Sequence, residues 1–233
     1  MSELLCELSY KCNLNCLHCS SIGCEEKQLD ITTIPKWILR KVDTVRISGG
    51  EPTELPIDDL LVTVNYFKAR GLKTILQTNG YNYEYSEEVF EAVDEVHVSL
   101  YGEQDIHEFI TRTRRSYDYA KTVLQWYKNT SIVTPFFNLQ QVHQVATIGE
   151  KLNIPVRITS LVNQGRCNIA LPIEKQCTDA HFLLHLFKNI ELTCSLTDKP
   201  CEYEDKFVIK PDGSIMNCAS TKQGVKTCPK YTL

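Results

Sequence analysis

Three cysteines lie close together near the start of the chain, with three residues between the first pair and two between the second pair. Thiolates at such spacing bind zinc, iron or iron–sulfur clusters. A structural zinc site closes with four ligands, usually in two close pairs, whereas this group offers only Cys12, Cys16 and Cys19. A cubane cluster held by three thiolates keeps one iron open for an outside ligand. The spacing therefore favours a catalytic 4Fe-4S cluster, with a zinc loop as the alternative.

The composition points the same way, because the 233 residues include eleven cysteines. In a reducing compartment so many thiols serve more often as metal ligands than in disulfides, and the odd total argues against complete pairing. No apolar run approaches the roughly 18 residues of a membrane span, and the N-terminus does not resemble a secretory signal. The net charge of -4 offers no general attraction for nucleic acid. We expect a soluble cytoplasmic protein with neither membrane nor nucleic acid as partner.

Short apolar runs alternate with amphipathic segments up to about Val162. β-Branched content predicts strands at 4–10, 44–49, 73–80, 95–102, 132–138 and 154–162. Helical periodicity predicts helices at 34–41, 57–71, 86–93, 117–129 and 139–153. This alternation indicates an α/β fold with parallel strands joined by helical crossovers, either an open sheet or a whole or partial barrel.

Beyond Val162 the alternation stops. A helix is predicted at 179–190, and residues 207–215 have the pattern of a hairpin that turns at Asp212-Gly213. We predict two domains, with residues 1–164 forming the α/β part and residues 165–233 a small cysteine-rich extension.

A glycine-rich segment, Ser48-Gly49-Gly50-Glu51-Pro52, follows the second predicted strand, as the cysteine group follows the first. The carboxyl ends of parallel strands form the face on which such folds build their sites. The two motifs together, in this order, resemble the radical S-adenosylmethionine (radical SAM) superfamily. The resemblance implies a partial (β/α)6 TIM-like barrel, a 4Fe-4S cluster on Cys12, Cys16 and Cys19, and S-adenosylmethionine (SAM) on its open iron.

Further positions resemble the cofactor-binding stretches of that superfamily. Thr78-Asn79-Gly80 and Ser99-Leu100-Tyr101-Gly102 end the third and fourth strands, and Tyr101 stands where relatives often have aspartate. Arg112 is the candidate for the cofactor carboxylate, in competition with Arg114 and Arg115. His18 matches an adenine-contacting position, or is a surface polar residue, and Leu161 either packs on adenine or belongs to the core. The resemblance therefore assigns cofactor binding to His18, Ser48, Gly49, Gly50, Glu51, Thr78, Ser99, Arg112 and Leu161.

A second cysteine group lies downstream, where Cys201 and Cys218 flank Gly213 with eleven and four intervening residues. This spacing resembles the auxiliary-cluster hairpin of the SPASM and twitch extensions. Cys194, Cys201, Cys218 and Cys228 are the predicted ligands of a second, auxiliary 4Fe-4S cluster, as in a twitch-type extension. Zinc on the same four thiols is the alternative, and Cys167 and Cys177 are the reserve ligands.

The resemblance implies an enzyme that cleaves SAM reductively to a 5′-deoxyadenosyl radical, which then abstracts a substrate hydrogen. Oxidative modification of a ribosomally made peptide, as a cross-link, thioether or epimerisation, is the leading hypothesis. Dehydrogenation of a small molecule such as an aminoglycoside-like sugar is the second. A non-enzymatic iron–sulfur or zinc protein is the hypothesis of another class. Expected partners are an electron donor such as flavodoxin or ferredoxin and, for a peptide substrate, a separate peptide-recognition protein.

Overall fold

The computed structural model of the chain describes residues 2–20, 27–161, 163, 165–197 and 205–216. In this part of the chain one nine-stranded sheet has the order β7-β6-β5-β4-β3-β2-β1-β8-β9. All neighbouring strands are parallel except β8 and β9. The strands are β1 (Glu3–Glu7), β2 (Thr44–Ser48), β3 (Lys73–Thr78), β4 (Glu95–Ser99), β5 (Thr130–Pro135), β6 (Val156–Thr159), β7 (Ile190–Leu192), β8 (Lys206–Ile209) and β9 (Ile215–Met216).

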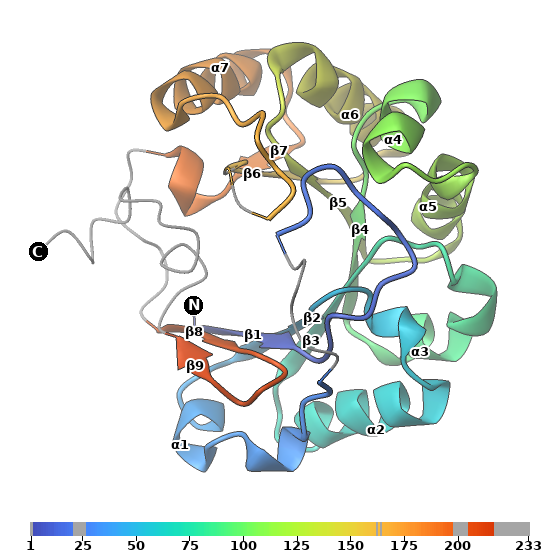
Figure 1. Cartoon of the computed structure of the whole chain (residues 1–233), viewed down its shortest axis with the longest axis vertical. Helices are drawn as coiled ribbons and strands as arrows, with labels where there is room; N and C mark the ends of the chain where they lie inside the picture. Colours follow the sequence, from blue (N-terminus) through green and yellow to red (C-terminus); the bar gives the residue numbers. More distant parts are fainter. Residues whose placement is uncertain (1, 21–26, 162, 164, 198–204, 217–233) are drawn as a thin grey trace, which may run out of the picture.

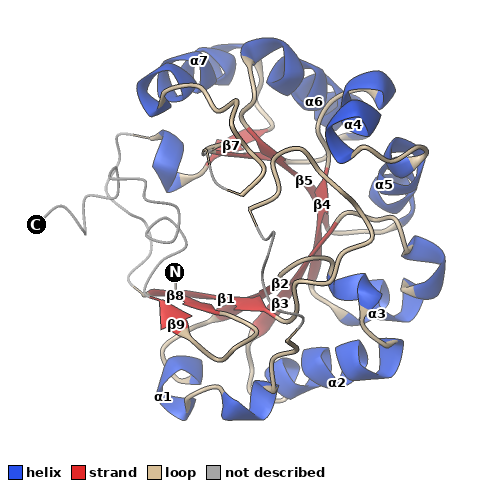
Figure 2. Cartoon of the chain, viewed as in Figure 1, coloured by secondary structure: helices blue, strands red, loops and turns tan. Residues whose placement is uncertain are grey.

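Helices cover the outer face of this sheet, which curls around a central space (Figures 1 and 2). They are α1 (Lys36–Leu39), α2 (Ile57–Lys68), α3 (Glu87–Ala92), α4 (Gln104–Thr111), α5 (Ser116–Trp126), α6 (Leu139–Leu152) and α7 (Ile173–Leu186). A doubly wound sheet would carry helices on both faces. Of the two architectures that the sequence left open, an open sheet and a barrel, the structure shows a partial TIM-like barrel.

Alternation along each strand separates the core from the interior of the barrel. In β1, Leu4 and Cys6 are fully buried in the main apolar cluster under the helices, while Glu3, Leu5 and Glu7 face the interior. The helix α2 buries Leu60, Val64 and Phe67 against the same cluster, as its amphipathic pattern predicts. The core therefore lies between sheet and helices, which leaves the inner face for polar groups.

Two helices differ from the sequence-based prediction. The pattern did not reveal α4, which is short and leads into Arg112 with a left-handed φ of 57°. The helix α7 begins at Ile173, directly after Pro172, whereas residues up to Cys177 read as a loop. Its end at Leu186 leaves room for β7, which pairs with β6 and is too short for any periodicity to reveal.

The C-terminal hairpin is confirmed, since β8 and β9 pair antiparallel around Asp212-Gly213. Gly213 has a φ of 80°, and the Ser214 N–H donates to Asp212 Oδ1 at 2.9 Å. On its other side β8 pairs in parallel with β1, so the sheet continues past the predicted boundary at residue 165. The division into two domains stays a prediction.

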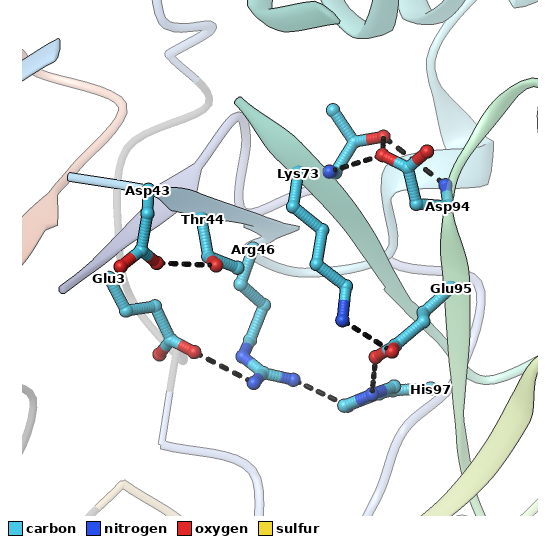
Figure 3. Close-up of polar contacts among 9 residues, drawn as sticks. Glu3, Asp43, Thr44, Arg46, Lys73, Asp94, Glu95 and His97 are labelled. Atoms are coloured by element: carbon cyan, nitrogen blue, oxygen red, sulfur yellow. Dashed lines mark hydrogen bonds and ion pairs between the residues drawn. The ribbon is translucent and has the colours of Figure 1, made fainter. Parts of the chain in front are cut away.

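Charged side chains form a connected layer on the inner face of β1, β2 and β4 (Figure 3). Glu3 accepts from Arg46 Nη2 at 2.8 Å and lies 3.2 Å from Lys206 Nζ. Arg46 also contacts His97 Nδ1, and His97 Nε2 lies 3.2 Å from Glu95 Oε2. Although burial raises the pKa of Glu3, the charges of Arg46 and Lys206 lower it to about 2. Glu3 therefore holds two cations in place inside the barrel.

No helix of the described residues is both long enough and apolar enough to cross a membrane.

The Glu3 network predicts a specific acid dependence of stability. Replacing Glu3 by the isosteric Gln leaves Arg46 and Lys206 without this carboxylate, and we expect a loss of about 3–5 kcal/mol in unfolding free energy at pH 7. Because the folded pKa is about 2, the contribution of Glu3 is complete above its unfolded pKa of roughly 4.5 and disappears as pH falls towards 2. Urea unfolding of metal-free protein between pH 7 and 2 measures this difference.

The control is Glu150→Gln at an exposed position of α6, which should stay within about 0.5 kcal/mol of the wild type. Stability curves of wild type and Glu3→Gln that remain parallel from pH 5 to pH 2 would contradict the assignment.

Candidate functional site

A cavity of about 330 Å³ occupies the interior of the partial barrel. Inward side chains of β1 to β6 and β8 line it, together with residues from the segments that follow β1, β2, β4, β6 and β7. Of the residues that the sequence assigned to cofactor binding, the cavity is lined by His18, Ser48, Gly49, Ser99 and Leu161. Gly50, Glu51, Thr78 and Arg112 do not line it.

The cysteine loop follows β1 and is anchored at both sides. The Leu17 N–H donates to the carbonyl of Ile110 in α4 at 2.8 Å, and the Arg166 N–H donates to the Cys19 carbonyl at 3.0 Å. Gly165 lies so close that an added Cβ would meet the Cys19 carbonyl oxygen at 2.3 Å. The Gly165-Arg166 step after β6 thus holds the loop against the cavity.

The three thiols of this loop lie close enough to influence one another electrostatically. Burial raises the pKa of Cys12 to about 11 and that of Cys16 to about 12, and neighbouring thiols add to both increases. Deprotonated ligands are needed for metal binding, so a bound cation would offset this cost. The loop therefore suits a cationic metal centre better than free thiolates.

The donor set of this loop consists of three free thiols, Cys12, Cys16 and Cys19. Thiolates are the usual ligands of iron–sulfur clusters, in which each binds a different iron atom. The three side chains therefore have the chemistry that a 4Fe-4S cluster needs, and their assignment as its ligands stays a prediction.

Gly49 and Gly50 let the segment after β2 lie directly on the segment that leads to Cys12. A Cβ on Gly49 would meet the Ser9 carbonyl oxygen at 2.2 Å, and one on Gly50 would meet the Lys11 carbonyl oxygen at 2.2 Å. The Gly50 N–H donates to Ser9 at 2.7 Å and the Glu51 N–H donates to Lys11 at 2.8 Å. The β1–β2 ladder thus extends as far as the residue before Cys12.

Glu51 is buried and ties this segment to the end of β3. Its carboxylate accepts from Thr53 N and Oγ1 at 3.1 and 2.7 Å, from Thr78 Oγ1 at 2.7 Å and from Asn79 N at 2.7 Å. Burial raises its pKa, although these hydrogen bonds act in the opposite direction. From the sequence we predict that Glu51 binds the ammonium group of a ligand. In the structure its carboxylate accepts hydrogen bonds from protein donors. The contact with an ammonium group stays a prediction.

Asn79 continues this network to the cysteine loop. Its Nδ2 donates to Asn13 Oδ1 at 2.8 Å and lies 4.0 Å from Cys12 Sγ, while its Oδ1 accepts from the Tyr81 N–H at 2.8 Å. Sequence reasoning placed Asn79 near the cofactor without a role. The glycine-rich segment, the Thr78-Asn79-Gly80 segment and Cys12 thus form one hydrogen-bonded unit.

His18 lies in an aromatic wall beside the cavity. Its ring meets Tyr101 and Phe137 edge-on, with centroids 4.7 and 5.2 Å apart. Burial lowers its pKa to about 4, so the ring is neutral at pH 7, and its buried Nδ1 has no hydrogen-bond partner among the described residues. Tyr101 in turn stacks on His107, at 5.2 Å and 17°. This placement beside the cavity favours a role for His18 in the candidate site over the alternative of a polar surface residue.

Leu161 is held by a residue that sequence reasoning missed. The fully buried Gln176 of α7 accepts from the Leu161 N–H at 2.8 Å and donates to the Leu161 carbonyl at 2.7 Å. It also donates to the Leu171 carbonyl at 2.7 Å. The available signal was a glutamine spaced four and seven residues before the buried Ala180 and Leu183, but the segment was interpreted as a loop. The side chain of Leu161 packs in a small cluster with Tyr101 and Phe137.

The remaining predicted residues lie away from the cavity or outside the described part. Arg112, Arg114 and Arg115 are all exposed, and none of them lines the cavity. Cys194 lies in the turn Cys194–Leu196, but its side chain is not described. Cys201, Cys218 and Cys228 lie outside the described residues, so the auxiliary cluster stays a prediction. Of the reserve ligands, Cys167 is buried and Cys177 donates to the Ser195 carbonyl at 3.8 Å.

The close approach at Gly50 predicts a large effect of one methyl group. In Gly50→Ala the new Cβ meets the backbone of Lys11 and Tyr10, which cannot rotate away. We expect a loss of about 1–3 kcal/mol in unfolding free energy, measured by urea titration of metal-free protein. The matched control is Gly71→Ala, where a Cβ has nothing within 4 Å and only the φ of 73° opposes it. If Gly50→Ala cost less than Gly71→Ala, the close approach would not constrain the loop.

Gln176→Leu should release the backbone at Leu161. It leaves the Leu161 N–H and two carbonyls without their partner, for an expected loss of about 2–4 kcal/mol. Hydrogen exchange of the Leu161 amide should accelerate, which a general packing defect would not single out. Gln140→Leu, at an exposed position of α6, is the control. Unchanged exchange at Leu161 would refute the assigned role.

Comparison with known proteins gives relatives of similar sequence and of similar fold. The chain is 30% identical to the mycofactocin maturase MftC of Mycobacterium tuberculosis over 178 residues, which covers 69% of this chain and 44% of that protein. It thus spans less than half the length of this curated relative. Streptococcus suis SuiB bound to S-adenosylmethionine superposes with a TM-score of 0.74 at 17% identity, over 94% of this chain and 60% of that one. The structure titled anSMEcpe with bound AdoMet and Cp18Cys peptide superposes with a TM-score of 0.65 at 17% identity, over 93% and 73%.

The likeness to the solved structures concerns the fold, since the identities are low. The match to a family is more specific: the model of the radical SAM superfamily matches residues 6–139, which include the cysteine loop, the glycine-rich segment and the strands β2 to β5. This stretch is more than half of the chain and contains both motifs that the structure joins by hydrogen bonds. The chain therefore belongs to the radical SAM superfamily, whose members are enzymes that use radical chemistry.

Proposed function

We propose that this protein is a radical SAM enzyme that modifies a ribosomally made peptide oxidatively. Membership of the family implies SAM and a 4Fe-4S cluster as cofactors. The observation that carries the proposal is the hydrogen-bonded unit of cysteine loop, glycine-rich segment and β3 end beside the cavity of the partial barrel. The relative named mycofactocin maturase and the neighbour with a bound peptide support the choice of a peptide substrate.

In this proposal Cys12, Cys16 and Cys19 hold the cluster at the mouth of the cavity. Cluster and cofactor together supply a 5′-deoxyadenosyl radical through reductive cleavage of SAM, and this radical abstracts a substrate hydrogen. His18 and Tyr101 provide a neutral aromatic wall next to the loop, and Ser48 and Ser99 place polar residues on the cavity side of β2 and β4.

The C-terminal extension belongs to the proposal as well. Cys194, Cys201, Cys218 and Cys228 would hold an auxiliary 4Fe-4S cluster in a twitch-type domain of residues 165–233, and that cluster would carry electrons to or from the substrate site. A small electron-transfer protein such as flavodoxin or ferredoxin would reduce the first cluster. A separate peptide-recognition protein would present the precursor peptide. Counting iron and sulfide per chain separates one cubane from two.

Formation of 5′-deoxyadenosine tests the activity directly. Protein reconstituted anaerobically with iron and sulfide should release it after addition of dithionite and SAM, as measured by liquid chromatography. Each of the variants Cys12→Ala, Cys16→Ala and Cys19→Ala should fall to the level of a protein-free reaction, because the cluster loses a ligand. The control Cys6→Ala removes a thiol that is buried in the core on β1. This variant should still form 5′-deoxyadenosine. Zinc alone at the three cysteines, or equal product from all variants, would refute the proposal.

A further inference from the structure

The described lining of the cavity contains more cationic than carboxylate side chains. Among the described residues that line the cavity, Arg46, Arg157 and Lys206 are cations and Glu3 and Glu7 are carboxylates. The neighbouring His97 adds no charge at pH 7, since burial and the nearby Arg46 lower its pKa although Glu95 acts in the opposite direction. The lining therefore has an excess of one positive charge.

The carboxylate of Glu3 is already shared between cations of the lining. Glu3 contacts both Arg46 and Lys206, at 2.8 and 3.2 Å, and Arg157 is near enough for its charge to lower the pKa of Glu3 too. Glu191 lies 3.8 Å from Arg157, but its side chain is 61% exposed, so this contact is screened by solvent. An anion inside the cavity would add charge-assisted hydrogen bonds to the contacts that these cations already make.

Accessibility distinguishes the three cations. The Arg46 side chain is 8% exposed and is held on both sides by Glu3 and His97. The side chains of Arg157 and Lys206 retain 19% and 18% exposure and lie on β6 and β8, so a molecule in the cavity can reach them. These two residues keep their protein contacts and still present charge to the cavity.

The floor is also separate from the cysteine loop. Glu3 begins β1 and Lys206 begins β8, and the two are paired in register. A rise of about 3.3 Å per residue places Glu3 roughly 13 Å along the strand from Glu7, after which the chain continues to the cysteine loop. Between Glu3 and Glu7, β1 contributes the uncharged Leu5 to the lining of the cavity, and β3 contributes Gln77.

We propose that the cavity floor binds a carboxylate of the substrate through Arg157 and Lys206. An unmodified peptide carries its negative charge as carboxylate, which accepts charge-assisted hydrogen bonds from guanidinium and ammonium groups. Anchored there, the substrate extends its uncharged part past Leu5 and Gln77 towards the cysteine loop. The carboxylate thus fixes which end of the substrate reaches the reactive end of the cavity. This inference rests on the proposed function, because it names the class of group that the same site recognises.

Short peptides test this subsite by NMR titration of the reconstituted protein in the presence of SAM. The probes are acetyl-alanyl-alanine with a free terminal carboxylate, acetyl-aspartyl-alanine amide with only a side-chain carboxylate, and acetyl-alanyl-alanine amide with neither. We expect binding of a carboxylate peptide and none of the neutral amide, and whichever carboxylate peptide binds identifies the source of the group. Equal binding of the neutral amide, tighter binding of inorganic phosphate, or loss of peptide binding through competition by SAM would overturn the inference.

Variants assign the binding to the two cations. Lys206→Met and Arg157→Met should each weaken carboxylate binding by about tenfold or more, as expected for loss of a hydrogen bond to a charged group. Lys206→Arg keeps the charge and should stay close to wild type, and Lys175→Met, which removes an exposed lysine on α7, is the matched control. Thermal unfolding verifies that each variant is folded. Equal affinity of Lys206→Met and Lys175→Met would contradict the assignment.

The two proposals fail in distinguishable ways. Formation of 5′-deoxyadenosine without carboxylate-dependent binding refutes only the subsite. Carboxylate binding without 5′-deoxyadenosine refutes the proposed activity and leaves an anion site in the barrel.

Discussion

The contact between Gly49-Gly50 and Ser9-Lys11 is the constraint on which the site depends. Backbone lies on backbone there, with no room for a side chain, and two hydrogen bonds continue the β1–β2 ladder beyond the strands. The cysteine loop starts one residue later. Its position is therefore set by the sheet itself rather than by flexible side chains, and Glu51 and Asn79 extend the same rigid unit to β3.

A second constraint applies inside the barrel, where buried charged side chains need partners of opposite charge or hydrogen-bonding groups. Arg46 is buried on β2, where Glu3 of β1 and His97 of β4 contact its guanidinium on the inner face of the sheet and offset the cost of burying its charge. An apolar interior would pack more simply, but it would give a substrate no orienting group. The structure instead keeps polar and charged groups inside the barrel. In the proposed enzyme, these groups position the substrate and the cysteine loop supplies the chemistry.

Local patterns predicted much of this arrangement. The thiol spacing and the glycine pair are short motifs whose meaning does not depend on the rest of the chain, and strands rich in β-branched residues revealed the α/β order. Contacts between distant segments were not readable: Gln176 meets Leu161 only because α7 folds back on the loop after β6, and Glu51 meets Thr78 across 27 residues. Arg46 and His97 stood in strands interpreted as buried apolar runs, and Glu3 lay just before the predicted strand 4–10. The alternation along these strands marks the inner face of a half barrel.

The pairing of β8 with β1 has a consequence for the order of assembly. Residues 3 and 206 are in register, so one edge of the first strand has no partner until almost the entire described chain has left the ribosome. Such pairing raises the contact order of the fold and slows its completion. The strand β1, which leads into the cysteine loop, is therefore made before every other described strand and gains its second neighbour only after β8 has been made.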